Sequence, residues 1–182
     1  MYDDGDIDYF IVTAPERLWI CRTFLVLFKK IFLLNSKKYF CVNYFVDENN
    51  LEIIDKNMFT AVEISYLLPV YNASLINQLK LENSWTKDYF PQFTHPISLS
   101  YNPPDKKKKK GMEALFRPNF ANTLDLWLMK LTFKRWQKKF SHFNNHKFEL
   151  TMRTNRGISK HHPQDFQNKV LNELNLKMAK FK

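Results

Sequence analysis

The first third of the chain contains three successive apolar runs, which have the periodicity of a strand, a helix and a strand. Aromatic and β-branched residues predict strands over residues 6–13 and 39–46, and residues 15–34 predict a long helix with Pro15 in its first turn. This order gives a crossover unit with two parallel strands, which a returning strand over residues 51–54 would extend. The expected fold class is therefore α+β (α/β), a small mixed sheet with a crossover helix followed by a helical C-terminal part.

Helical periodicity returns several times downstream. It predicts helices over residues 58–68, 73–90, 119–143 and 163–181, and residues 148–154 read as a short strand or an extended segment. Four prolines and five consecutive lysines make residues 91–111 a linker. We therefore expect a partial sheet domain, a helical segment packed on it, a Pro/Lys-rich linker and a basic, mainly helical region, over residues 1–57, 58–90, 91–112 and 113–182.

Two of the predicted helices carry their polar side chains along one side. In residues 15–34, polar pairs that include Arg22 and Lys29 recur every seven residues and form one narrow stripe. Such a helix should be buried on most sides, and its charges leave no apolar run long enough to cross a bilayer, so no membrane role is expected.

In residues 119–143, five apolar side chains should face the core, namely Leu124, Trp127, Leu128, Leu131 and Trp136. The same helix has a basic side formed by Lys130, Lys134, Arg135, Lys138 and Lys139.

Charge is distributed unevenly along the 182 residues, whose formal net charge is +10. Residues 1–91 hold nine Lys/Arg against twelve Asp/Glu, a net charge of −3, whereas residues 92–182 hold nineteen against six, a net charge of +13. This asymmetry indicates an acidic half and a basic half that could face a polyanion. Cys21 and Cys41 fit neither a metal-binding spacing nor a disulfide framework, which favours a reducing cytoplasm.

The candidate chemistry begins at Asp6 and Asp8, two residues apart at the start of the first strand. Alternate strand residues project from the same face, with α-carbons about 6.5–7 Å apart. Carboxylates at that separation suit Mg²⁺, a hard cation that prefers carboxylate oxygens and substrate phosphates. The alternative is a charged turn over residues 3–6 that happens to precede a strand.

The chain resembles the nucleotidyltransferase-fold proteins of the DNA polymerase beta superfamily, most closely a bacterial group of uncharacterised nucleotidyltransferase-domain proteins. The resemblance runs over the whole chain. It is carried by Asp6-Ile7-Asp8-Tyr9-Phe10-Ile11-Val12-Thr13, residues 14–19, the long apolar helix, residues 38–46 and Ser159-Lys160-His161-His162-Pro163-Gln164-Asp165-Phe166-Gln167. Only the Asp-x-Asp strand is a motif of the wider superfamily, and it is short.

This resemblance implies a metal-dependent transferase of phosphorus-containing groups. Asp6 and Asp8 would bind Mg²⁺ (or Mn²⁺) and position a nucleoside triphosphate for attack at its α-phosphate. The nucleoside monophosphate would pass to an acceptor that is a small molecule, a protein or an RNA end. The superfamily also has a third carboxylate on a neighbouring strand, where this chain has Asn43. Asn43 is a substituted ligand, a hydrogen-bonding neighbour of the ligands or an outward-facing residue, and Asp47 or Glu52 are the substitutes nearby.

The superfamily pattern also places a Gly-Ser pair before the Asp pair, where a helix start binds triphosphate. Met1 lies five residues before Asp6, and no glycine of the chain belongs to a Gly-Ser pair. We interpret the chain as a fragment, the alternative being a protein that has lost nucleotide binding. Taken alone, it should transfer nucleotide slowly or not at all. Without a preceding strand, residues 6–13 should also have an unpaired apolar edge that favours association.

Basic residues of the second half are candidates for phosphate contacts, and they support a second hypothesis of a non-catalytic module that binds nucleic acid weakly. The lysine run could bind phosphates or form a solvated loop, and it comprises Lys106, Lys107, Lys108, Lys109 and Lys110. Arg135 and Lys139 share a helix face, near a Trp136 that we expect in the core. His161 and His162 stand before a helix that Ser159 and Asp165 could cap, and capping is preferred here to a binding site.

Overall fold

The computed structural model describes residues 7–36, 40–93, 111, 114 and 119–181. The chain forms two compact units. The first, here the sheet unit, comprises Met1–Asn50 and Met112–Gln164, and the second, the helical unit, comprises Leu51–Gly111 and Asp165–Lys182. Each unit therefore combines an early and a late part of the sequence.

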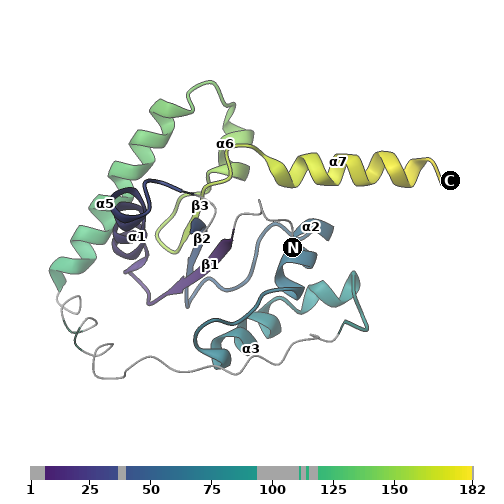
Figure 1. Ribbon diagram of the computed structural model, residues 1–182, viewed down its shortest axis with the longest axis horizontal. Coiled ribbons are helices and arrows are strands. Elements are labelled where there is room, and N and C mark those ends of the chain that lie inside the picture. The colour runs from purple at the N-terminus through teal and green to yellow at the C-terminus, as the bar shows by residue number, and fades with distance from the viewer. Residues whose placement is uncertain (1–6, 37–39, 94–110, 112–113, 115–118, 182) are drawn as a thin grey trace. The chain divides into compact units, whose positions relative to one another are not determined.

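The sheet unit is built on three strands (Figure 1). Strand β1 (Asp8–Thr13) leads through helix α1 (Leu18–Phe32) to strand β2 (Cys41–Asp47), which pairs with β1 in parallel. Strand β3 (Ile158–Lys160) pairs with β2 in antiparallel orientation, which gives the order β1-β2-β3. The small mixed sheet and its crossover helix are thus confirmed, and the fold is α+β.

The third strand is not the one that the sequence predicts. Residues 51–54 form no strand, although Leu51 and Ile53 are buried. The buried side chain of Asn83 accepts a hydrogen bond from the N–H of Ile53 at 2.8 Å and donates one to the carbonyl of Leu51 at 2.8 Å. These backbone groups are therefore satisfied by one amide side chain instead of a neighbouring strand.

Helices complete the sheet unit around one apolar core. Helix α5 (Asn119–Lys139) packs against α1 (Figure 1). Helix α6 (Asn145–Thr151) occupies most of the segment predicted as extended, because the side chain of Asn144 accepts a hydrogen bond from the N–H of Lys147 at 2.8 Å and starts a helix there. The buried core comprises Leu18, Trp19, Val42, Phe45, Trp136, Phe140 and Met152.

Two predictions about helix faces are wrong. Only the first part of α1 is buried, and the side of its second part that carries Phe28 and Phe32 is exposed. In α5, Trp127 and Leu131 are 57% and 51% exposed instead of facing the core. The sequence shows that a helix has an apolar side, but it does not show whether the fold supplies a partner for that side.

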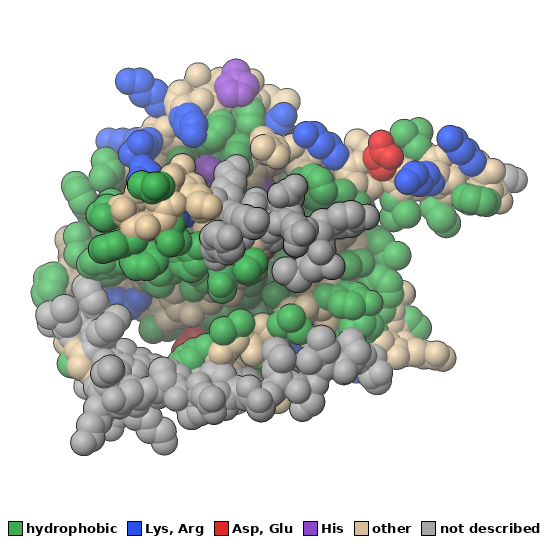
Figure 2. All heavy atoms as spheres, viewed as in Figure 1, with side chains coloured by type: hydrophobic (Ala, Val, Ile, Leu, Met, Phe, Trp, Pro, Cys, Tyr) green, Lys and Arg blue, Asp and Glu red, His purple; other side chains and the backbone are tan. Residues whose placement is uncertain are grey.

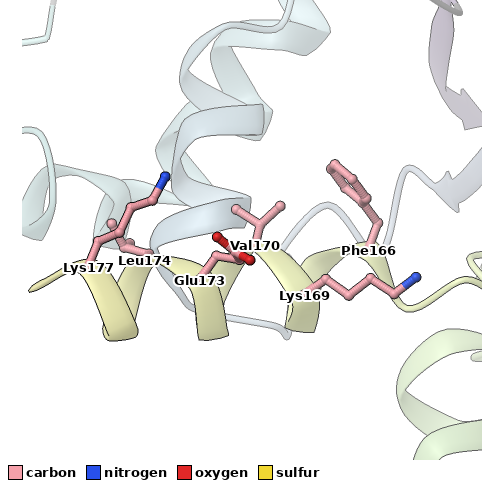
Figure 3. A pocket seen from close by; sticks show the side chains of 6 residues that line it. All are labelled: Phe166, Lys169, Val170, Glu173, Leu174 and Lys177. Carbon is pink, nitrogen blue, oxygen red and sulfur yellow. The ribbon is translucent and has the colours of Figure 1, made fainter. Parts of the chain in front are cut away.

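The helical unit contains α2 (Met58–Ser65), α3 (Ala73–Glu82), the 3₁₀ helix η1 (Ser84–Asp88) and α7 (Phe166–Ala179). Asn57 and Thr60 form a reciprocal capping box at the start of α2. Helix α7 packs on α2, and the rings of Phe59 and Phe166 are 6.1 Å apart. The described lining of a pocket on α7 (Figure 3) comes from that helix, through Phe166, Lys169, Val170, Glu173, Leu174 and Lys177.

This division differs from the predicted order of domains. Residues 113–182 were expected as one region, but α5, α6 and β3 belong to the sheet unit, whereas α7 belongs to the helical unit. One reason is that β3 pairs with β2 and so joins the sheet. The other is that Trp136 in α5 and Phe140, which follows α5, pack in the same core as Leu18 and Trp19 of α1. Most of the predicted linker lies outside the described residues.

Candidate functional site

The candidate site lies at the amino end of β1. Asp8 is the first residue of this strand and is exposed. The Nδ2 of Asn43, on the neighbouring strand β2, is 3.4 Å from the Oδ1 of Asp8. The structure therefore brings together Asp8, a predicted carboxylate ligand, and Asn43, the neutral residue that the sequence analysis named on the neighbouring strand.

An irregularity in the strand register directs Asn43 toward Asp8. Tyr9 pairs with Val42 and Phe10 pairs with Tyr44, so Asn43 has no counterpart in β1. An extra residue of this kind bends a strand and changes the direction of its side chain. The carbonyl of Asn43 accepts a hydrogen bond from the N–H of His161 at 2.9 Å. The Ser-Lys-His-His-Pro segment thus contributes to the site through its backbone.

Cys41 lies beside the two polar residues. Its thiol is buried, and the Nδ2 of Asn43 is 2.8 Å from its Sγ. Burial, followed by the hydrogen bond and the negative charge of Asp8, raises the pKa of Cys41 to about 11. The positive charge of Lys29, from α1, acts on the same thiol in the opposite direction. A lysine of the predicted polar stripe therefore acts electrostatically on Cys41.

Of the two other carboxylates proposed as ligands, Asp47 lies away from Asp8 along the same pair of strands, and Glu52 belongs to the other unit. Asp47 pairs with Thr13 at the opposite end of β1, about 16 Å along the strand from Asp8. Its Oδ1 accepts hydrogen bonds from the N–H of Asn49 at 3.0 Å and from Asn50 at 2.6 Å, so it orders the turn after β2. Glu52 belongs to the helical unit and forms an ion pair with Lys56 at 2.6 Å.

Several predicted site residues lie outside the described part of the chain. Asp6 is one of them, and so are Lys106, Lys107, Lys108, Lys109 and Lys110. Within residues 7–36, 40–93 and 119–181, together with residues 111 and 114, no group of three or more His, Cys, Asp or Glu side chains could hold a metal ion.

The basic side of α5 is exposed, as predicted for Arg135 and Lys139. Figure 2 shows Lys and Arg side chains over the carboxyl half of α5 and over α6. Trp136 lies between these residues in sequence but is only 6% exposed and belongs to the core. The buried ring of Trp136 therefore cannot serve as a platform for nucleic-acid bases.

A buried cation on the inner side of α1 was not anticipated. Arg22 is 8% exposed, and its guanidinium lies 4.6 Å from the ring centre of Trp136 and 5.8 Å from that of Trp19. Burial lowers the pKa of Arg22 to about 10. The ring of His161 packs on Trp136 as well, with 4.9 Å between ring centres. Arg22, one residue of the predicted polar stripe, therefore faces these aromatic rings rather than solvent.

Asp125 in α5 is a second buried ionisable residue, and the sequence pattern did not indicate it. Its Oδ1 accepts hydrogen bonds from the N–H groups of Trp19 at 2.8 Å and Ile20 at 3.0 Å. It thus caps the first turn of α1 from another helix, because Arg17 at the N-cap position provides no side-chain cap. Burial raises the pKa of Asp125, although these hydrogen bonds oppose the shift.

The predicted capping role of Ser159 is wrong. Ser159 lies inside β3 and is buried, and its Oγ has no hydrogen-bond partner in the described part of the chain. Asp165 does stand at the N-cap position of α7, but it makes no side-chain cap and accepts a hydrogen bond from Asn168 at 3.1 Å instead. Asp165 has a left-handed backbone, with φ of 53°, which explains the different direction of its side chain.

Comparisons of the chain with protein-family models, with curated proteins and with solved structures found no match. None of the described helices has the length and apolar character required to cross a membrane.

Proposed function

We propose that the chain is a Mg²⁺-dependent nucleotide-binding domain of the nucleotidyltransferase type, with Asp8 as a metal ligand. The observation that carries this proposal is the exposed Asp8 at the rim of the mixed sheet, 3.4 Å from Asn43 on the adjacent strand. Asp6, two residues earlier, would supply the second carboxylate. The reaction would transfer a nucleoside monophosphate to a small molecule, a protein or an RNA end.

The residues at this site fit a magnesium ion. Mg²⁺ usually keeps several waters and binds through one or two carboxylates together with substrate phosphates. An exposed carboxylate at a strand end leaves room for those waters, and the amide of Asn43 can order Asp8 or a coordinated water. When bound, the ion would neutralise phosphate charge. Lys29, which acts electrostatically on the neighbouring Cys41, is placed to contribute a second positive charge.

The proposal includes a low intrinsic activity and a cytoplasmic setting. Phosphoryl-type transfer depends almost entirely on positioning and charge stabilisation. The described residues offer one carboxylate and one lysine for this work, so the chain alone should transfer nucleotide slowly. Cys21 and Cys41 are free thiols, which suits a reducing compartment.

The test is calorimetric titration of nucleoside triphosphates with and without Mg²⁺. We expect Mg²⁺-dependent binding that Asp8→Asn weakens by about tenfold or more, because a metal ligand is lost while the side-chain volume is kept. Asp88→Asn, at an exposed position of η1, is the matched control and should bind like the wild type. Equal Mg²⁺-dependent affinities in the wild type and Asp8→Asn would contradict the proposal.

A second candidate function is a non-catalytic module of the same fold that binds polyanions. The observation in its favour is the exposed basic side of α5, including Arg135 and Lys139. The same titrations distinguish the two functions. Binding that is independent of Mg²⁺, falls steeply with salt and is lost in Arg135→Ser/Lys139→Ser but not in Asp8→Asn supports the polyanion module.

A further inference from the structure

The second part of α1 exposes a continuous apolar side. Five residues with the spacing of one helix face are each 46–69% exposed, and we call them the α1 apolar face: Phe24, Leu27, Phe28, Ile31 and Phe32. An aromatic side chain has about 150–250 Å² of surface, so at these exposed fractions the five side chains together expose about 500 Å². Patches of about 300–600 Å² are the largest on typical monomers and are often functional.

Aromatic contacts connect this face to the edge of the sheet. The rings of Phe28 and Phe32 are 5.0 Å apart, and Phe28 contacts Phe40 at 6.2 Å. Phe40 in turn contacts Tyr9 in β1 at 5.1 Å. The apolar surface therefore extends from the end of α1 to the beginning of β1, entirely within the sheet unit.

Strand β1 lies at the edge of the sheet. It pairs with β2 on one side, and no strand of the described residues pairs with its other side. Its residues Tyr9, Phe10, Ile11 and Val12 are uncharged and only half-buried. An edge of this kind is a template for another strand, and charges or prolines that would prevent pairing are missing from these four positions.

We propose that the α1 apolar face and the free edge of β1 together form the interface of a symmetric dimer of this chain. A two-fold interface must be complementary to itself. Antiparallel pairing of two β1 edges satisfies that condition, and its two-fold axis, perpendicular to the sheet, places both copies of α1 on the same side of one continuous sheet. The α1 apolar face holds no charge, so two copies can meet without like-charge repulsion at the contact.

The size of the surface agrees with a second copy as the occupant. Two α1 apolar faces bury about 1,000 Å² in total, which is the lower limit for a specific interface, and the paired strands add to it. Because each copy carries a net charge of +10, long-range repulsion opposes the dimer. Salt should therefore strengthen self-association, whereas it weakens binding to polyanions or anionic membranes.

Sedimentation equilibrium of the full chain tests the dimer. We expect Ile31→Glu to weaken self-association by more than about tenfold, since a charge would enter the apolar contact. Leu176→Glu in α7 is the matched control, because Leu176 is 66% exposed and Ile31 is 65% exposed. Circular dichroism verifies the fold, and Phe32→Ser replaces Ile31→Glu if helix content falls.

Salt and lipid distinguish the dimer from other occupants. Raising the ionic strength from about 0.1 M to about 1 M should tighten the wild-type dimer. Three results would overturn the proposal: a chain that stays monomeric at about 100 μM, a dimer that Ile31→Glu leaves unchanged, or a monomer that binds zwitterionic vesicles through Ile31.

Discussion

Asp125→Ala is expected to lower the free energy of unfolding by about 2–4 kcal/mol, since an N-cap and the acceptor of two buried N–H groups are lost together. Asp125 is fully buried and accepts hydrogen bonds from Trp19 and Ile20 in the first turn of α1. Trp19 belongs to the apolar core, so the loss should affect the sheet unit as a whole. Urea denaturation measures the change, and the exposed Asp88→Ala is the control, with an expected effect within about 0.5 kcal/mol.

Asp125→Asn separates the hydrogen bonds from the charge. Asparagine keeps an oxygen acceptor, so it should be tolerated better than alanine. Because burial raises the pKa of Asp125 above its ordinary value of 3.8, the folded state binds a proton more tightly than the unfolded state. The stability of the wild type relative to Asp125→Asn should therefore rise as the pH falls through the folded-state pKa toward 3.8. If the stability difference between the wild type and Asp125→Asn did not change with pH, it would contradict a raised pKa for Asp125.

The second large effect is a loss of stability in acid that depends on His161. This ring packs on Trp136 at 4.9 Å and on Phe140 at 6.0 Å. Burial, followed by the positive charges of Arg22, Lys139 and His162, lowers the pKa of His161 from 6.5 to about 3. Below pH 6.5 the unfolded chain binds a proton at His161 that the folded chain does not, so stability is lost as the pH falls toward 3. By pH 4 the loss should reach about 3 kcal/mol.

The His161 effect is measured as the free energy of unfolding against pH. His161→Phe keeps an aromatic ring but cannot bind a proton, so its curve should fall less than that of the wild type between pH 6.5 and 4. Leu18→Ala, another core substitution, is the control for packing, because it should lower stability by a similar amount at each pH. Parallel curves for the wild type and His161→Phe would contradict a neutral, buried His161.

Local periodicity was sufficient to place the long elements of this fold. The apolar runs of β1, β2, α1 and α5 lie within the predicted ranges or within one residue of them, because each element has enough residues to show its period. The three-residue strand β3 was missed because it is short and its partner β2 is more than a hundred residues away in sequence. Residues 51–54 have the pattern of a strand, but Asn83 provides their hydrogen bonds.

The candidate site was only partly predictable for a similar reason. The resemblance singled out Asn43 on the neighbouring strand and left open whether it is a ligand, a hydrogen-bonding neighbour or an outward-facing residue. In the structure its Nδ2 lies 3.4 Å from the Oδ1 of Asp8. The register irregularity that sets Asn43 apart from its neighbours depends on pairing between strands and has no local signal.

The most direct test of the proposed function is to locate a bound Mn²⁺ ion by paramagnetic broadening of amide signals, in the presence of a nucleoside triphosphate. The two ends of β1 are about 16 Å apart, and broadening falls steeply with distance. Substoichiometric Mn²⁺ therefore distinguishes a metal site at one end of β1 from a site at the other end. Our account predicts that the amides of Asp8, Cys41 and Asn43 broaden first, and that Asp8→Asn removes this effect. Broadening that is strongest around Asp47, or that is unchanged in Asp8→Asn, would contradict a metal site at the amino end of β1.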